Sequence, residues 1–210
     1  MSGLMSAHGF QKLTDVSRET LDRLAHYEAL LKKWNKAINL VSPATLKDAR
    51  SRHFIDSAQI YALAKEDWQI WCDMGSGGGF PGLVIAILAA ELKPASEVVL
   101  LESDQRKATF LRTVARETGI KATVISDRIE TAEPIGADVL SARALASLTN
   151  LLEFSERHLK PEGQALFPKG ATWQQELQEA KRTWSFSHEV TKSIVESNSV
   201  ILSIGGIARG

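Results

Sequence analysis

From residue 69 onward, short apolar runs alternate with longer amphipathic segments. The apolar runs predict strands at residues 70–74, 97–101, 121–126, 137–140 and 164–167, then at 186–194 and 199–204. The segments that follow the first, second, fourth and fifth runs predict helices at residues 81–92, 104–118, 145–158 and 172–183. Strands that alternate with helices indicate a mostly parallel, doubly wound α/β sheet. The last two runs have no clear helix between them, so we expect a terminal antiparallel hairpin and seven strands in all.

The first third of the chain has a helical pattern instead. Apolar residues recur at steps of three and four from Leu21 to Ile38, and Ser17 before them is a good N-cap. Ser42 and Pro43 predict the start of a second helix that runs to about residue 64. Residues 1–16 are expected to be a poorly structured lead-in. We therefore predict a helical extension at 1–66 packed on an α/β domain at 67–210.

A glycine-rich segment follows the first predicted strand and precedes a helix. Gly75, Gly77 and Gly79 stand at alternate positions, two residues after Asp73. Such a turn brings backbone N–H groups and a helix N-terminus close to a ligand, where a Cβ would interfere. The dinucleotide fingerprint would need a glycine where Phe80 stands. The spacing resembles the nucleotide loop of S-adenosylmethionine-dependent methyltransferases, although a tight turn without a ligand has the same pattern.

Charged residues follow the ends of the next strands. Glu102 ends the second strand, where an acid accepts hydrogen bonds from ribose hydroxyls, although an acid there also suits the dipole of the next helix. Residues 127–130 follow the third strand and would lie over the adjacent crevice, where an apolar side chain could cover an adenine. Arg143 follows the fourth strand at the lip of the crevice. It could hold the methionine carboxylate, contact an RNA phosphate or pair with Glu130.

The second predicted helix carries a polar cluster on an apolar stripe. His53 is spaced by seven residues from both Leu46 and Ile60, so it shares their face. Asp56 lies three residues after His53, and Arg52 and Asp56 form an i, i+4 pair. The favoured interpretation is a structural network that joins this helix to the α/β domain. Direct work on a substrate is the alternative, and spacing does not separate the two.

Composition narrows the range of partners. The chain has 210 residues, of which 44% are hydrophobic, and 25 Lys and Arg balance 25 Asp and Glu. A nucleic-acid partner would therefore need a local basic patch. The longest apolar run, 83–90, is too short for a membrane span, and residues 1–10 show no signal peptide. The single Cys72 forms no disulfide within the chain and fits a buried packing role. These features predict a cytoplasmic protein with neither a membrane partner nor a metal site.

With these residues in view, the chain resembles the RsmG (GidB) family of bacterial methyltransferases, which act on N7 of a guanine in 16S ribosomal RNA. The resemblance extends from about residue 21 to the C-terminal strands. Its marks are Asn39-Leu40, Arg52-His53-x-x-Asp56-Ser57, residues 73–82, Glu102 with Lys107 and 110–111, residues 127–130, residues 141–144 and Lys169-Gly170. The Gly-Phe-Pro-Gly ending at 79–82 and the Arg-His-x-x-Asp cluster are far more specific than the glycine-rich segment alone.

The resemblance implies a class I methyltransferase fold, with a Rossmann-like, mostly parallel sheet of seven strands and an N-terminal helical extension. It implies S-adenosylmethionine as cofactor and 16S rRNA, within the small ribosomal subunit, as partner. The cofactor contacts expected from the segment pattern and the resemblance together are Gly75, Gly77, Gly79, Phe80, Glu102, Ile129, Glu130 and Arg143. The residues expected near the RNA, or as braces of the site, are Arg52, His53, Arg128 and Lys169.

The chemistry of guanine N7 limits what the protein must supply. N7 carries a lone pair and no proton, so methyl transfer needs positioning and exclusion of water rather than a general base, and we name no catalytic residue. The zero net charge predicts that an assembled small subunit is a better substrate than naked RNA. We expect a monomer. The alternatives are a methyltransferase of another substrate and a non-catalytic, S-adenosylmethionine-binding assembly factor.

Overall fold

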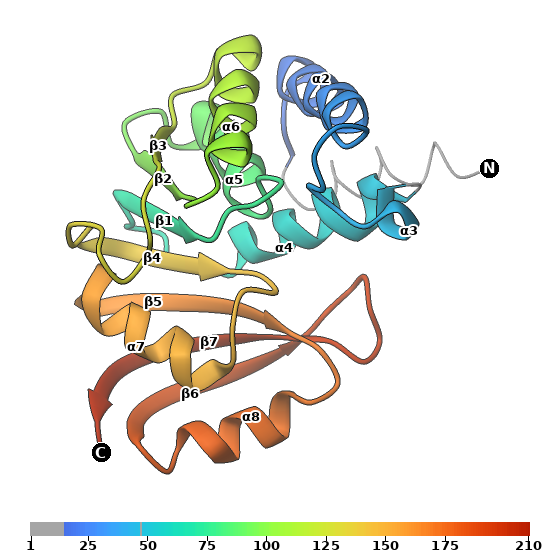
Figure 1. Ribbon diagram of the computed structural model, residues 1–210. Coiled ribbons are helices and arrows are strands. Elements are labelled where there is room, and N and C mark those ends of the chain that lie inside the picture. Colours follow the sequence, from blue (N-terminus) through green and yellow to red (C-terminus); the bar gives the residue numbers. More distant parts are fainter. Residues whose placement is uncertain (1–14, 47) are drawn as a thin grey trace.

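Seven strands form one sheet in the order β3-β2-β1-β4-β5-β7-β6 (Figure 1). In this computed structural model, which describes residues 15–46 and 48–210, the strands are β1 (Ile70–Met74), β2 (Glu97–Leu101), β3 (Thr123–Ile125), β4 (Ala137–Ala142), β5 (Leu159–Lys169), β6 (Trp184–Lys192) and β7 (Val200–Arg209). Strands β1 to β5 pair in parallel, and β7 runs antiparallel to both β5 and β6. The predicted parallel sheet with a terminal antiparallel hairpin is confirmed.

Helices cover both faces of this sheet. They are α2 (Arg18–Trp34), α3 (Pro43–Leu46), η1 (Arg50–Ile55), α4 (Asp56–Ala62), α5 (Gly82–Leu92), α6 (Gln105–Thr118), α7 (Leu148–His158) and α8 (Trp173–Ala180). Helices α4 and α6 pack beside α5 on one face, with α2 against α5 and α6, while α7 packs on the other face beside α8 (Figure 1). The strand order reverses between β1 and β4. In open α/β sheets, ligands bind in the crevice at the carboxyl ends of the strands at this point.

The two faces of the sheet have separate hydrophobic cores. Trp71 belongs to the core shared with α2, α4, α5 and α6, whereas Cys72 and Met74 belong to the core beneath α7. The side chains divide in this way because successive residues of a strand point to opposite faces. Cys72 is fully buried, as expected of a packing residue. The predicted boundary after residue 66 falls between α4 and β1, and the division into two parts stays a prediction.

The region from Ser42 to residue 64 is not the single continuous helix that the sequence predicts. It consists of the short α3, the π-helix η1 and α4. A π-helix has more residues per turn than an α-helix, so side chains four apart no longer line up along it. Arg52 pairs with Glu196 and Asp56 pairs with Arg143, so neither has the other as its ion-pair partner. Burial raises the pKa of Asp56, and the charge of Arg52 is among those that oppose this rise.

Some element ends also differ from the prediction. Helix α2 ends at Trp34 rather than near Ile38, because the Asn35 side chain accepts hydrogen bonds from the Leu40 and Val41 N–H groups at 3.0 and 2.9 Å. Strand β5 (Leu159–Lys169) starts five residues before the predicted strand at 164–167 and ends two residues after it. The predicted lead-in lies almost wholly outside the described residues. None of the helices in the described part of the chain has both the length and the apolar character needed to cross a bilayer.

Candidate functional site

Two cavities meet at the loop that follows β4. The first, which we call the glycine-loop cavity, has a volume of about 400 Å³ and is lined by residues that follow β1, β2, β3 and β4. The second, the hairpin cavity, has a volume of about 410 Å³ and is lined by η1, α4, the end of β5 and the β6–β7 loop. Arg143, Ala144 and Ala146 line both cavities. The arrangement places two ligand-sized spaces side by side at the switch point of the sheet.

The floor of the glycine-loop cavity requires glycine at two positions. Gly75 and Gly77 have φ values of +63° and +53°, a region that other residues rarely adopt. A Cβ on Gly75 would lie 2.6 Å from a methyl carbon of Leu145. A Cβ on Gly77 would have only the Gly75 carbonyl oxygen nearby, at 3.7 Å, so it would project into open space. The loop thus leaves room against its backbone for a ligand.

Glu102 borders this cavity from the end of β2. Its carboxylate accepts hydrogen bonds from the N–H groups of Gly77 and Asp104, each at 2.8 Å. The side chain is buried, which fixes its orientation beside the glycine loop. An ionised carboxylate has about four acceptor positions, so two backbone bonds leave capacity for the hydroxyls of a ribose. The predicted position of Glu102 at the end of the second strand is confirmed.

The outer wall of the glycine-loop cavity includes Arg128, Ile129 and Glu130, as the sequence pattern predicted. This loop is held from behind by α7. His158 is fully buried, and its Nε2 lies 2.7 Å from the Ile129 carbonyl oxygen. Burial lowers the pKa of His158, so the ring is neutral and donates its Nε2–H to that carbonyl. Sequence reasoning missed His158, because nothing in its local pattern links it to a loop 29 residues away.

Beneath the glycine loop, Asp73 anchors three elements. Its carboxylate accepts hydrogen bonds from the Ser141 hydroxyl at 2.7 Å and from the Gly82 N–H at 3.1 Å. Ser141 in turn accepts a hydrogen bond from the Trp71 indole N–H at 2.9 Å. Complete burial raises the pKa of Asp73 to about 6, and the hydrogen bonds from Ser141, Ser76 and Gly82 oppose that rise. The network joins β1, β4 and the start of α5, and its partners were not predicted.

Gly79 and Phe80 do not occur among the described residues that line the glycine-loop cavity. A Cβ on Gly79 would lie 2.7 Å from the Tyr27 hydroxyl, so this glycine allows close approach of α2. The Phe80 ring is 4.8 Å from the His53 ring, and the Arg143 guanidinium lies 5.1 Å from the Phe80 centroid. Phe80 therefore supports Arg143 through a cation–π contact. Cofactor contacts by Gly79 and Phe80 stay predictions.

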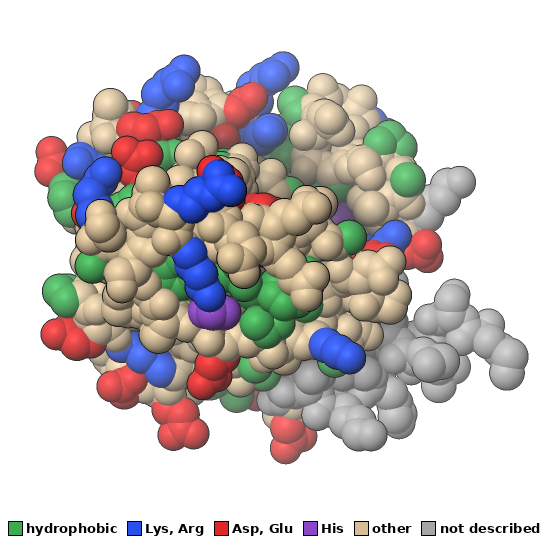
Figure 2. Space-filling view, turned by 90° about the horizontal axis from the view of Figure 1, so that it is seen from below, with side chains coloured by type: hydrophobic (Ala, Val, Ile, Leu, Met, Phe, Trp, Pro, Cys, Tyr) green, Lys and Arg blue, Asp and Glu red, His purple; other side chains and the backbone are tan. Residues whose placement is uncertain are grey.

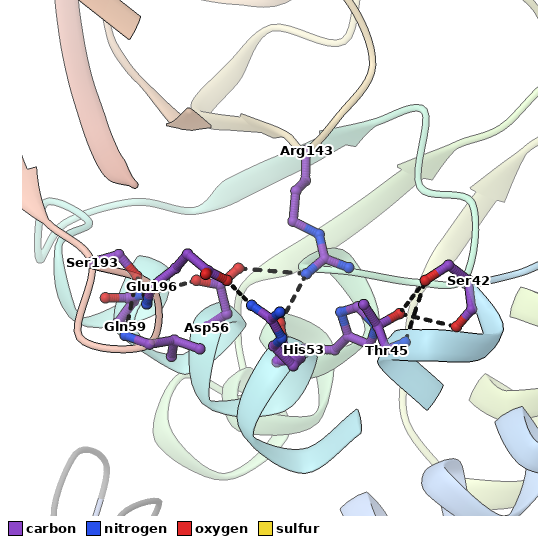
Figure 3. Close-up of polar contacts among 10 residues, drawn as sticks. Ser42, Thr45, His53, Asp56, Gln59, Arg143, Ser193 and Glu196 are labelled. Carbon is purple, nitrogen blue, oxygen red and sulfur yellow. Dashed lines mark hydrogen bonds and ion pairs between the residues drawn. The ribbon is translucent and has the colours of Figure 1, made fainter. Parts of the chain in front are cut away.

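His53 is buried on the wall of the hairpin cavity. Its Nε2 lies 3.0 Å from the Thr45 hydroxyl (Figure 3), and its ring packs on Phe80. Burial and the nearby Arg143 charge lower the pKa of His53 to about 4. The ring is therefore neutral at physiological pH. The contacts join the region from α3 to η1 with the glycine-rich segment, which agrees with the interpretation of this cluster as a structural network.

Each Arg and Lys among the described residues that line the hairpin cavity has a carboxylate partner. The pairs are Arg143 with Asp56 at 3.4 Å, Lys169 with Glu176 at 2.8 Å, and Arg52 with Glu196. Arg143 points from the loop after β4 toward Asp56 and the π-helix (Figure 3). Lys169 also donates to the Ala146 carbonyl at 3.0 Å, so it braces the loop shared by the two cavities. On the face drawn in Figure 2, basic and acidic side chains are likewise mixed.

Residues 20–204 match the GidB family, described as rRNA small subunit methyltransferase G. The chain belongs to this family. The ribosomal RNA small subunit methyltransferase G of Ruegeria pomeroyi is 54% identical over 195 residues, which cover 93% of this chain and 95% of that protein. The protein of the same description from Rhodospirillum centenum is 52% identical over 202 residues, which cover 96% and 91% of the two chains.

Solved structures agree with the fold. A methyltransferase from Geobacter sulfurreducens superimposes with a TM-score of 0.58 at 17% sequence identity, over 88% of each chain. The sheet is that of class I methyltransferases. As a member of the GidB family, the protein is an S-adenosylmethionine-dependent rRNA methyltransferase, as the resemblance implied. The glycine-loop cavity fits this cofactor, because Gly75 and Gly77 line it without side chains and Glu102 presents acceptors beside it.

Proposed function

We propose that the protein methylates N7 of a guanine in 16S rRNA, with S-adenosylmethionine in the glycine-loop cavity and the guanine in the hairpin cavity. The observation that carries this proposal is the shared wall of the two cavities at Arg143, Ala144 and Ala146. A methyl group passes directly between two ligands only when their binding sites adjoin. A base can enter the second cavity from a single-stranded loop or by flipping out of a helix.

The residues of the glycine-loop cavity have distinct roles in this proposal. The backbone at Gly75 and Gly77 approaches the cofactor closely, and Glu102 accepts hydrogen bonds from its ribose. Ile129 covers the adenine, held in place by the bond from His158 to its carbonyl. Glu130 lies exposed at the rim, within the same cavity lining.

The residues of the hairpin cavity position the guanine and exclude water. When bound, S-adenosylmethionine supplies an electrophilic methyl group. Guanine N7 has no proton to lose, so the neutral, buried His53 need not act as a base. Arg143 is oriented by Asp56 and by the face of Phe80, at the boundary where the two ligands meet. Lys169 holds the Ala146 carbonyl and so fixes the shared loop.

We further propose that the assembled small subunit, rather than naked 16S rRNA, is the preferred substrate, and that a cytoplasmic monomer acts on it. The chain has no net charge, and affinity for bare RNA comes mainly from neutralised phosphates. Arg128, which is exposed beside the glycine-loop cavity, can supply one local contact to RNA. Equal initial rates on naked 16S rRNA and on small subunits would contradict this part of the proposal.

The test is to incubate the pure protein with radiolabelled S-adenosylmethionine and small subunits from a strain without this methylation, and then to map the label. We expect label at N7 of one guanine in 16S rRNA. Glu102→Gln should lower both labelling and cofactor affinity, whereas Glu133→Gln, at an exposed acid in the described region, should leave both unchanged. Cofactor binding without any label in the RNA would refute the assignment of the substrate.

A further inference from the structure

Among the described residues that line the hairpin cavity, no cation is without a carboxylate partner. Its cations Arg52, Arg143 and Lys169 each lie against a carboxylate. An RNA phosphate that binds one of these cations therefore competes with the carboxylate already there. The pair that exchanges its carboxylate for a phosphate is the one whose separation costs the least free energy.

Burial distinguishes the three pairs. The side chains of Arg143 and Asp56 are 19% and 16% exposed, and those of Lys169 and Glu176 are 8% and 24% exposed. Separating such a pair leaves a charge in a poorly solvated place, which is strongly unfavourable. Arg52 and Glu196 are 42% and 48% exposed, so water solvates both after separation and the pair itself contributes little. Arg52 is thus the cation that can change partners.

Glu196 can leave Arg52 while the β6–β7 hairpin stays docked. The Gln59 side chain holds the hairpin by donating to the Ser193 hydroxyl at 3.2 Å and accepting from the Ile194 N–H at 3.1 Å. The Ser193 hydroxyl also accepts a hydrogen bond from the Glu196 N–H at 3.2 Å, so the backbone of the turn is fixed independently of the Glu196 carboxylate. The sticks in Figure 3 show Gln59 and Ser193 beside Glu196 on this side of the cluster.

We propose that Glu196 occupies the position of an RNA phosphate on Arg52, and that substrate RNA displaces it when the guanine enters the hairpin cavity. The inference rests on the proposed function of that cavity. A guanidinium binds a carboxylate and a phosphate through the same parallel N–H donors, so one acceptor replaces the other without a change in Arg52. The Arg52–Glu196 pair lowers the affinity for RNA that does not present a phosphate at Arg52, and so it favours the correct substrate.

The test compares Glu196→Gln with wild type. The measurements are the KM for small subunits lacking the methylation, at saturating S-adenosylmethionine, and the Kd for 16S rRNA by filter retention. Loss of an exposed ion pair predicts RNA binding that is tighter by roughly 1.5- to 5-fold. The gain should shrink as salt rises, because salt screens the Arg52–Glu196 pair in wild type. In an Arg52→Ala background, Glu196→Gln should give no gain.

Glu189→Gln is the matched control, since it removes the same charge from an exposed position on strand β6 of the same hairpin. An equal gain from Glu189→Gln would assign the effect to net charge and overturn the proposal. Unchanged or weaker RNA binding by Glu196→Gln would overturn the proposal as well. If the melting temperature of Glu196→Gln fell together with its RNA affinity, the Arg52–Glu196 pair would serve the stability of the fold, and the proposal would also be overturned. Labelling by wild type tests the proposed function separately, so failure of the two proposals is distinguishable.

Discussion

Asp73→Asn should change how the stability of the protein depends on pH. Asp73 is fully buried, and burial raises its pKa from an ordinary value of 3.8 to about 6. The folded protein therefore binds this proton more tightly than the unfolded chain does. The resulting stabilisation is complete below pH 3.8 and is lost as the pH rises through 6. Asparagine does not titrate, so the variant lacks this dependence.

The magnitude follows from the shift in pKa. A shift from 3.8 to about 6 is roughly two pK units, and each unit corresponds to about 1.4 kcal/mol, which gives about 3 kcal/mol. The free energy of unfolding of wild type minus that of Asp73→Asn should therefore fall by about 2 kcal/mol between pH 4 and pH 7, because the rest of the total is lost below pH 4. A constant offset from altered bonds to Ser141 and Gly82 adds to this difference but does not depend on pH.

The assay is equilibrium unfolding in urea, followed by tryptophan fluorescence, at half-unit steps from pH 4 to pH 7.5. Asp138→Asn is the control. Burial raises the pKa of Asp138, but hydrogen bonds from Lys160 and from the N–H groups of Ile70 and Gln69 outweigh it and hold the pKa below its ordinary value. The corresponding difference for Asp138→Asn should therefore stay nearly constant from pH 4 to pH 7.5, because almost all of its rise with pH falls below pH 4. A pH-independent difference for Asp73→Asn would refute the reasoning that places a titrating carboxylate beneath the glycine loop.

Two further predictions concern the glycine-rich segment. Gly77→Ala forces an alanine to φ near +53° and adds a methyl group to a residue that lines the glycine-loop cavity. Binding of S-adenosylmethionine, measured by calorimetry, should weaken at least about tenfold, while backbone strain lowers stability by only about 1–2 kcal/mol. Binding within twofold of wild type would place the cofactor elsewhere. Tyr27→Phe removes the hydroxyl that donates to the buried Gly78 carbonyl at 2.5 Å, which should cost about 1–3 kcal/mol and lower the melting temperature by several degrees. An unchanged melting temperature would show that this bond adds no net stability.

The sequence alone determined the elements whose signals are local. The predicted bounds of β1 and β2 are those of the structure, because each is a short apolar run that ends at polar or glycine residues. Ser17 caps α2, and Gly119 ends α6 at a φ of +67°, since both signals depend only on residues within one turn. The order of strands and helices also predicted the sheet and its C-terminal hairpin. The glycine-rich segment and Glu102 predicted the position of the glycine-loop cavity, because each directly follows a strand that the local pattern predicts.

Only the tertiary structure decided how the charged and polar residues pair. Local spacing matched Arg52 with Asp56, but each forms its ion pair with a partner more than 80 residues away, Arg52 with Glu196 and Asp56 with Arg143. In the same way, Asp73 meets Ser141 across neighbouring strands, and His158 reaches the carbonyl of Ile129. A hydrogen bond or ion pair depends on a few ångströms in space, and sequence periodicity fixes only which face of an element a residue occupies. The hairpin cavity is built from segments far apart in the chain, so the sequence did not predict it and only the folded sheet brings its residues together.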